Sequence, residues 1–380
     1  MRVKLESFLE ETSEKTTRNN QHPVLTSSKS GLYLQSDYFN KQVASTDNTG
    51  YKIIRRGEFT YRAMSDTGEF FPNMLECADI GIVSPAYPVF RIAKPSVIVP
   101  EYLKYFFKSD SFQFSIASFA QGSTRTSIKY AKLKTVTIEL PAITDQKHIV
   151  EVLNKLAAII EKRKQQLTKL DNLVKSRFIE LFEGGNYPFE PLDNNVIEMF
   201  IGPFGSSLKN EVFVDEEDGF CMVYEQKHAI QKTMDVPTRY VPKSKYEELK
   251  RFTILGGDII VSCRGTIGEI FVVPNDAPMG IMHPSIMKIR LNTEKYNQKF
   301  FVFALEQYMD EHSAEAKGSG VKMAVSATVL GQSDFVIPPI DVQDQFAAFV
   351  EQTDKSKLAV QHSLEKLETL KKSLMQQYFG

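Results

Sequence analysis

The chain of 380 residues contains a long internal repeat. Residues 140–182 align with residues 337–379 without a gap. Each copy begins with Leu-Pro or Ile-Pro, reaches Gln146 or Gln343 six residues later, continues through Leu-x-Lys-Leu-x-x-Leu-x-Lys-Ser and closes on a Phe. A repeat of this length indicates that one architecture is used twice. We therefore expect two globular modules, each followed by a matching long helix.

A coiled-coil seam runs through both copies of the repeat. Alternating steps of four and three residues from Ile149 meet apolar side chains at eight of ten positions, and the same register from Phe346 meets seven. Because the polar exceptions fall at different steps, we expect the two helices to pair with each other as distinct partners. Each helix of about 34 residues would be about 50 Å long. The seam positions that we expect to pack are Ile149, Leu153, Leu156, Ile160, Leu167, Leu170, Val174, Val350, Val360, Leu364, Leu367 and Leu374.

The segments that precede the two helices also repeat. Gly57-Glu58-Phe59 matches Gly257-Asp258-Ile259, and a Gly-Ile-x-x-Pro run begins at Gly81 and again at Gly280. Short apolar runs broken by Gly and Pro, followed by an aromatic-rich helical stretch, are typical of an α+β module. We expect the first strand near Val24. The predicted boundaries are residues 1–140 for the first module, 141–185 for its helix, 186–336 for the second module and 337–380 for the last helix.

Composition narrows the class of protein. With 42% apolar residues the chain can bury real cores. It has no apolar run of about 18 residues and no apolar signal segment at Met1, so we expect a cytoplasmic protein. Its three cysteines, Cys77, Cys221 and Cys263, are too scattered for a disulfide framework or a zinc site.

The charge distribution does not by itself demand a nucleic-acid partner. The formal net charge is -1, residues 1–140 carry 18 basic and 14 acidic side chains, and residues 186–336 carry 15 basic and 21 acidic ones. Any contact with DNA must therefore depend on local patches rather than on bulk charge.

The motifs of common catalysts are missing. No Gly-x-x-x-x-Gly-Lys-Ser/Thr phosphate loop is present, which disfavours an autonomous ATPase. Ser84-Pro85-Ala86-Tyr87 lacks the second proline of the amino-methyltransferase loop that it faintly resembles. The acidic run 215–218 is more typical of a solvated turn than of a cation site. We expect a reader or a scaffold with no catalytic residue, no metal site and no cofactor of its own.

Several loops could contact a polyanion. Glycines allow the backbone to approach closely, hydroxyl groups and lysines suit phosphate oxygens, and an Arg at a strand end can present its guanidinium to a guanine edge. Because a shared fold would also repeat its turns, recurrence in both modules supports this interpretation only in part. The candidate contact residues are Ser206, Ser207 and Lys209; Arg264 and Thr266 with their counterparts Tyr61 and Arg62; Ser123, Thr124 and Arg125 with Ser319 and Lys322; and Gln226 and Lys227.

Taken together, the motifs resemble one known family. The Leu/Ile-Pro-x-Ile-x-x-Gln start and the repeated helix, with Gly-Asp-Ile-Ile-Val-Ser-x-x-Gly-Thr-Ile-Gly from Gly257 and Gly-Pro-Phe-Gly-Ser-Ser-Leu-Lys from Gly202, resemble the DNA-specificity subunit of type I restriction–modification systems. The resemblance covers essentially the whole chain. It implies two similar α+β target-recognition domains, separated by two long antiparallel coiled-coil helices in a pseudo-twofold repeat.

The same resemblance implies a function and its partners. Each target-recognition domain would read one half of a bipartite site in double-stranded DNA. The helices would dock two DNA methyltransferase (modification) subunits and, through them, restriction/translocase subunits. S-adenosylmethionine, ATP and Mg would then belong to those partners.

Two readings of the architecture stay open. Modules held about 50 Å apart would meet duplex positions on the order of 15 base pairs apart, so that helix length would set an unread gap between two half-sites. Alternatively, the modules bind other proteins and the coiled coil assembles a scaffold without sequence-specific DNA binding. The near-neutral charge and the acidic second module favour this alternative.

Overall fold

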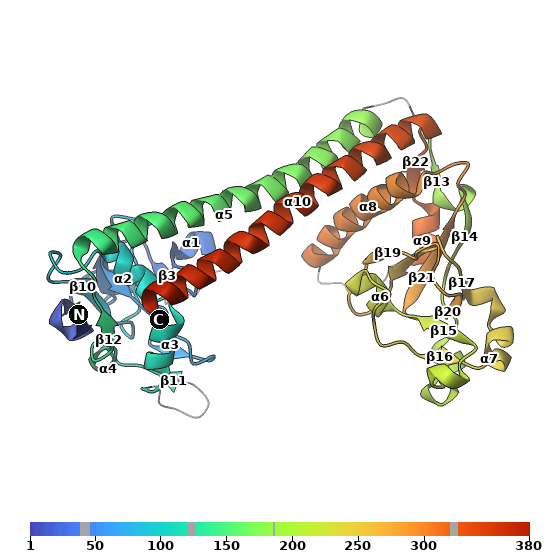
Figure 1. Ribbon diagram of the computed structural model, residues 1–380. Coiled ribbons are helices and arrows are strands. Elements are labelled where there is room, and N and C mark those ends of the chain that lie inside the picture. The colour runs from blue at the N-terminus through green and yellow to red at the C-terminus, as the bar shows by residue number, and fades with distance from the viewer. Residues whose placement is uncertain (39–45, 120–125, 185–186, 320–325) are drawn as a thin grey trace. The chain divides into compact units, whose positions relative to one another are not determined.

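The computed structural model describes residues 1–38, 46–119, 126–184, 187–319 and 326–380 (Figure 1). The chain folds as two units, the first made of residues 1–166 with 360–380 and the second of residues 167–359. Both units mix helices and strands, and each is described separately below.

A four-stranded sheet in the order β2-β10-β6-β8 forms the centre of the first unit. Shorter pairs flank it, namely β1 with β12, β5 with β9, β3 with β4 and β7 with β11. The strands are β1 (Arg2–Lys4), β2 (Leu9–Thr12), β3 (Leu25–Ser27), β4 (Leu32–Leu34), β5 (Lys52–Arg55), β6 (Phe59–Thr60), β7 (Met64–Ser65), β8 (Asn73–Met74), β9 (Ile80–Val83), β10 (Val89–Ile92), β11 (Thr126–Ser127) and β12 (Thr137–Glu139). The short helices are α1 (Gln35–Tyr38), α2 (Pro100–Phe106), α3 (Asp110–Ala117) and α4 (Tyr130–Leu133).

The second unit contains two four-stranded sheets, in the orders β14-β21-β18-β19 and β16-β15-β20-β17, and the pair β13–β22. Its strands are β13 (Phe189–Pro191), β14 (Val196–Ile201), β15 (Cys221–Tyr224), β16 (Tyr240–Val241), β17 (Thr253–Ile254), β18 (Ile259–Ser262), β19 (Ile270–Val272), β20 (Gly280–Met282), β21 (Ile286–Leu291) and β22 (Asp334–Val336). Its helices are α6 (Gln226–Gln231), α7 (Lys243–Glu248), α8 (Gln298–Ser319) and α9 (Ala327–Gln332).

The two modules share a design that the sequence repeat predicts. The order β2-β10-β6-β8 corresponds strand for strand to β14-β21-β18-β19. Gly57 and Gly257 both adopt a left-handed backbone, with φ of +85° and +84°, which favours glycine. The carboxylate that follows each glycine accepts a hydrogen bond from a backbone N–H three residues earlier, at 2.8 Å from both Glu58 and Asp258. The turns before the two matching strands are therefore built in the same way.

The expectation that the first strand lies near Val24 is wrong. β1 and β2 precede it, and they pair antiparallel with distant strands, β1 with β12 (Arg2 opposite Glu139) and β2 with β10 (Leu9 opposite Ile92). β2 reads Leu-Glu-Glu-Thr, with both glutamates exposed, so it lacks the alternation that signals a strand. These strands are fixed by their distant partners rather than by their own sequence.

Two long helices complete the fold. α5 (Ile143–Phe178) continues as a π-helical turn over Ile179–Glu183, and α10 spans Ile340–Phe379. In the first unit the beginning of α5 packs antiparallel to the end of α10, with Lys164 bonded to Glu368 at 3.1 Å. In the second unit the end of α5 packs against the beginning of α10, with the rings of Phe178 and Phe346 5.6 Å apart (Figure 1). The predicted α+β class with two similar modules and two long antiparallel helices is confirmed.

The seam positions lie between the helices or against the modules. The buried seam residues are Ile149, Leu153, Leu156, Ile160, Val174, Val360 and Leu364, and the half-buried ones are Leu167, Leu170, Val350, Leu367 and Leu374.

Among the described helices, none combines the length and apolar character needed to cross a lipid bilayer.

Candidate nucleic-acid interface

Three strand ends meet at one edge of the second module. β15 and β20 run parallel, so Glu225 and His283 follow neighbouring strand ends, and the His283 N–H donates to the Tyr224 carbonyl at 2.8 Å. β18 ends nearby, because the Cys263 N–H donates to the carbonyl of Ser285 at 2.8 Å. The loops that leave these strands are therefore held together by backbone hydrogen bonds.

Charged side chains gather at this edge. We call Glu225, Lys227, Arg239, Arg264 and His283 the strand-end cluster. Glu225 is 8% exposed, and its carboxylate accepts from Lys227 at 2.7 Å and from the Arg239 guanidinium. Burial raises the pKa of Glu225, but the hydrogen bonds from the two cations outweigh it and the pKa is lowered. The Glu225 carboxylate thus faces two cationic side chains, and the charge of Arg264 acts on the neighbouring His283. Cations therefore outnumber the carboxylate in the strand-end cluster, which suits an anion.

The two histidines at this edge stay neutral near pH 7. Burial is the main cause that lowers the pKa of His283. The charge of Glu225 raises this pKa, whereas the charges of Arg239, Arg264 and Lys227 lower it further. Burial also lowers the pKa of His228, whose Nδ1 accepts from the Glu225 backbone N–H at 3.0 Å. The imidazoles therefore brace the loops instead of adding charge.

Hydrogen-bonding side chains also lie at these strand ends, with Gln226, half-buried, as the first residue of α6. Gly265 has a φ of +71° and lies against Gln226, whose amide atoms are 3.7 and 3.8 Å from the position that a Cβ would occupy. Arg264 and Thr266 on either side of this glycine are exposed. Within the described part of the chain, Arg264 makes no ion pair. The structure thus brings together four of the predicted contact residues, namely Gln226, Lys227, Arg264 and Thr266.

The loop that follows β14 passes over the same edge. A Cβ on Gly202 would lie 2.3 Å from the His283 carbonyl oxygen, so only glycine permits this approach. Ser206 and Lys209 are exposed and Ser207 is half-buried, while Leu208 packs into the apolar cluster around Val223 and Ile281. The predicted Ser206, Ser207 and Lys209 therefore belong to a loop that is anchored beside the strand-end cluster.

In the first module one predicted contact residue is wrong. Tyr61 is fully buried, and its hydroxyl donates to the Ile128 carbonyl at 3.1 Å inside the core. Burial raises the pKa of this hydroxyl. A side chain held in this way cannot contact a surface ligand. Its neighbour Arg62 points outward and forms a 3.6 Å ion pair with Asp66, as the alternation of side chains along an extended segment requires.

Other predicted contacts lie outside the described segments or at their ends. Ser123, Thr124, Arg125 and Lys322 lie outside the described residues. Ser319, expected in a loop, is the last residue of α8. Sequence reasoning also missed Glu225, Arg239 and His283 as members of the strand-end cluster. Only the run from Tyr224 to His228 hinted at them, because Arg239 is brought to Glu225 by the tertiary fold.

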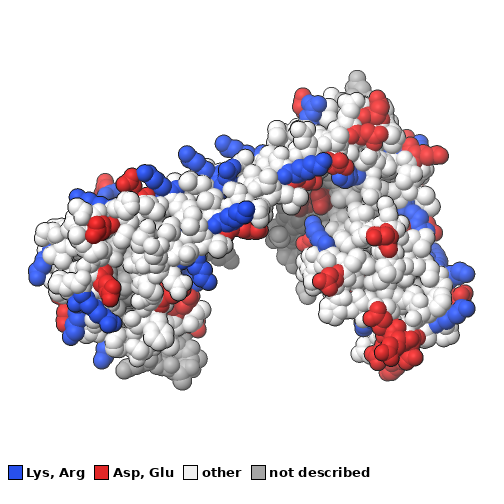
Figure 2. Space-filling model, in the orientation of Figure 1, with Lys and Arg blue, Asp and Glu red and all other residues white. Residues whose placement is uncertain are grey.

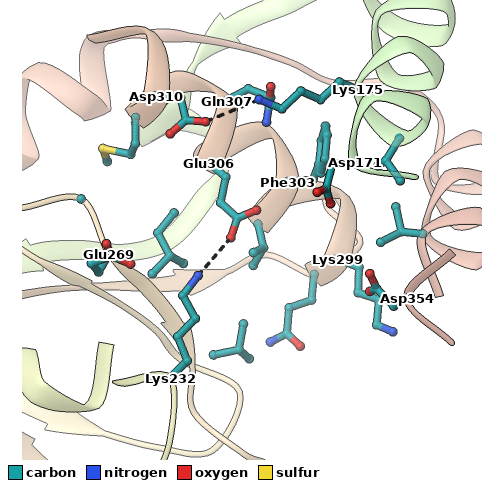
Figure 3. A pocket seen from close by; sticks show the side chains of 18 of the residues that line it. Asp171, Lys175, Lys232, Glu269, Lys299, Phe303, Glu306, Gln307, Asp310 and Asp354 are labelled. Atoms are coloured by element: carbon teal, nitrogen blue, oxygen red, sulfur yellow. Dashed lines mark ion pairs between the residues drawn. The ribbon is translucent and has the colours of Figure 1, made fainter. Parts of the chain in front are cut away.

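A cleft of about 1790 Å³ lies within the second unit, lined by α8, the loop around Gly268 and segments of α5 and α10 (Figure 3). Ion pairs cross its walls, with Lys175 3.7 Å from Asp310 and Lys232 3.8 Å from Glu306. Burial raises the pKa of Glu306 although Lys232 opposes it. Among the described residues, no group of three metal-ligating side chains occurs in this cleft or elsewhere.

Acidic side chains gather near β16. Figure 2 shows a compact acidic group at the end of the second unit near β16. The run 215–218 is exposed there, and Glu216–Asp218 form a short 3-10 helix. The run adjoins Tyr240, the neighbour of Arg239, because the Val214 N–H donates to the Tyr240 carbonyl at 3.0 Å.

Comparison with known proteins identifies the family. The family model described as "Type I restriction modification DNA specificity domain" matches residues 33–170 and 219–371. A putative type I restriction enzyme MjaX specificity subunit from Methanocaldococcus jannaschii is 25% identical over 296 residues, which cover 73% of this chain and 67% of that protein. The MjaIX specificity subunit of the same organism is 33% identical over 161 residues, or 39% of this chain and 36% of that protein.

Solved structures share the fold. A chain from a study of complex assembly and conformational transition of the type I R-M system aligns with a TM-score of 0.64 and 16% identity, covering 100% of this chain and 97% of that one. The type I restriction–modification S subunit from M. genitalium aligns with a TM-score of 0.53 and 16% identity, covering 100% and 96%. At this level of identity the likeness concerns the fold alone.

Proposed function

This chain belongs to the type I restriction–modification DNA specificity family, and from that premise we propose that it is the non-catalytic subunit that recognises a bipartite DNA site. Each module would read one half-site in double-stranded DNA. The chain would supply recognition, while methylation and cleavage belong to partner subunits.

The observation that carries this proposal is the strand-end cluster of the second module. Its cations and the exposed Lys209 suit phosphate oxygens, which fix the position of a protein on the duplex. Gln226 and Arg264 carry the side-chain types that form bidentate hydrogen bonds with adenine and guanine, respectively. Gly265, which follows Arg264, lies against the Gln226 amide. Positioning groups and base-reading groups therefore share one edge.

The first module supports the same reading with fewer described residues. Arg62 follows β6 as Arg264 follows β18, and the two strands occupy equivalent places in equivalent sheets. We assign Arg62 to the half-site of the first module. Its ion pair with Asp66 joins two half-exposed side chains, so a phosphate or a guanine could replace the carboxylate at little cost.

The long helices are the proposed docking surface for two methyltransferase (modification) subunits. Lys and Arg side chains follow α5 on the face drawn in Figure 2, and the side chains of Ile159 and Leu173 on α5 are 45% and 49% exposed. Exposed apolar side chains beside charged ones are typical of a helix that receives a protein partner. Restriction/translocase subunits would join through the modification subunits. S-adenosylmethionine, ATP and Mg would be bound by these partners.

Two measurements test the proposal. Affinity of the complex with modification subunits for random duplex DNA should fall steeply between two salt concentrations, because bound phosphates release counterions. Methylation mapping of cells with and without this chain should show a bipartite motif that depends on it. An unchanged methylation pattern together with salt-independent binding would reject the proposal.

The second candidate is a protein-interaction scaffold without sequence-specific DNA binding. The exposed acidic run 215–218 is the observation that favours it, since such a surface repels a duplex. This scaffold would assemble with the modification subunits, yet its complex would bind random and target duplexes equally weakly.

A further inference from the structure

Phe204 is the most exposed large apolar side chain among the described residues. Its exposed fraction is 88%, compared with 85% for Phe114 on α3, 81% for Met1 and 70% or less for the other large apolar side chains. A phenyl ring left in water contributes nothing to the core, and removing it from water on binding would be favourable. Phe204 is therefore a candidate for contact with a ligand rather than for stabilisation of the fold.

The loop holds Phe204 in a defined position. The preceding Pro203 is buried, and the backbone carbonyl of Phe204 accepts a hydrogen bond from the Ser207 N–H at 2.8 Å. At the start of the loop the Gly202 N–H donates to the Ile286 carbonyl at 3.0 Å, and at its end Leu208 is 5% exposed. A ring displayed on a braced loop loses little conformational freedom when it binds.

The loop that carries Phe204 lies beside the strand-end cluster. A Cβ on Gly202 would meet the backbone of His283, and the charges of Lys227, Arg239 and Arg264 act on His283. Ser206 and Lys209, which follow Phe204 in the chain by two and five residues, are exposed. An apolar ring flanked by hydroxyl and cationic groups matches a duplex, in which stacked bases lie between two rows of phosphates.

We propose that Phe204 is an apolar wedge that inserts into the base stack of the half-site bound by the second module. The wedge would unstack one base step and bend the duplex, as apolar side chains do in proteins that kink DNA. Flexible pyrimidine–purine steps deform most easily, so Phe204 would add specificity at a step that no polar side chain reads. This inference rests on the proposed DNA-reading function.

The test uses the full chain in complex with its modification subunits and a duplex that carries the mapped target. 2-Aminopurine placed at successive positions of the second half-site reports unstacking as a rise in fluorescence. The wild-type complex should give this rise at one step, Phe204→Ala should abolish it and weaken binding on the order of 10- to 100-fold, and Phe204→Trp should retain it. Phe114→Ala removes a comparably exposed ring from the first unit and should leave both readouts unchanged.

The possible outcomes distinguish the wedge role of Phe204 from the proposed DNA-recognition function. If the wild-type complex binds its target with no fluorescence rise, or if Phe204→Ala behaves as Phe114→Ala does, the wedge is rejected while DNA recognition stands. If Phe204→Ala lowers recovery of the modification subunits instead, Phe204 is a protein contact and the wedge is again rejected. If no complex binds DNA in a salt-dependent manner, the proposed function and the wedge are both rejected.

Discussion

Gln146 and Gln343 make the same three hydrogen bonds at the starts of the two long helices. The Gln146 Oε1 accepts from the Val99 N–H at 2.9 Å, and its Nε2 donates to the carbonyls of Val97 and Pro141, both at 3.0 Å. The Gln343 Oε1 accepts from the Asn297 N–H at 2.8 Å, and its Nε2 donates to the carbonyls of Lys295 and Pro338 at 2.9 and 2.7 Å. Both glutamines are fully buried. Gln146 thus links the first turn of α5 to the residues just before α2, and Gln343 links the first turn of α10 to the residues just before α8.

The first prediction concerns these glutamine anchors. Gln146→Ala and Gln343→Ala each leave three backbone groups, most of them partly buried, without their partner, so each should lower the free energy of unfolding by roughly 2–3 kcal/mol. Gln→Glu should not restore it, because a carboxylate can accept from the N–H but cannot donate to the two carbonyls. Urea unfolding of the purified chain measures the effect. Gln165→Ala on the exposed face of α5 is the control and should change stability by less than about 0.5 kcal/mol.

The anchors also show what the sequence could reveal. The Gln that follows Leu140-Pro141 and Ile337-Pro338 was visible as a repeated letter, and the repeat predicted the paired helices and the shared module design. Its three-bond role was not visible, because the partners lie about 50 residues away in the chain. The internal repeat thus predicts the architecture, whereas the hydrogen bonds that fix it become apparent only in the three-dimensional structure.

The two wrong predictions, for the first strand and for Tyr61, have a common physical cause. The local pattern does not predict β2, because Glu10 and Glu11 obscure its alternation, although Arg91 and Glu10 pair across β10 and β2 as Arg290 and Glu198 pair across β21 and β14. The pattern places Tyr61 at the surface because an aromatic residue beside Arg62 fits either face. Strand pairing and facing direction depend on partners far along the chain, which a local pattern does not specify.

The corrected position of Tyr61 yields the second prediction. Tyr61→Phe removes the bond to the Ile128 carbonyl and should lower the free energy of unfolding by about 1 kcal/mol, with no change in the methylated DNA motif. Arg62→Ala should have the opposite profile, with near-unchanged stability and weakened discrimination in one half-site. Thermal unfolding and methylation mapping provide the two readouts. An altered motif for Tyr61→Phe would contradict the burial argument.

The third prediction separates positioning from base reading in the second module. Lys209→Ala should weaken binding to all duplexes alike and reduce the slope of affinity against salt by about one. Arg264→Ala should cost roughly 1–3 kcal/mol of discrimination at one base position. Both are measured by competition binding with single-base variants of the target. Lys250→Ala, which removes an exposed lysine paired with Glu247, is the matched control.

The fourth prediction follows from the buried histidines. Burial lowers the pKa values of His228 and His283 in the folded chain, whereas an unfolded histidine titrates near 6.5. As the pH falls below about 6.5, the unfolded chain therefore takes up protons that the folded chain resists, and the free energy of unfolding falls. Measured between pH 8 and pH 5, this decline should be shallower in His228→Asn/His283→Asn. His362→Asn, which removes an exposed histidine from α10, is the matched control substitution.

The last prediction concerns the gap between the half-sites. Insertion of seven residues into both α5 and α10 preserves the coiled-coil register and lengthens each helix by about 10 Å. If helix length sets the gap, the methylated motif should gain about three unread base pairs, at 3.4 Å per pair. Both half-site sequences should stay the same, because Gln146 and Gln343 still hold each module to its helix. Methylation mapping of cells that carry the lengthened chain measures the gap.

Insertion into α5 alone is the control. It breaks the pairing of Lys357 with Asp171, and cells that carry this variant should lose methylation of the motif. A lengthened chain that methylates the original motif, or one with altered half-sites, would show that the helices do not act as the spacer.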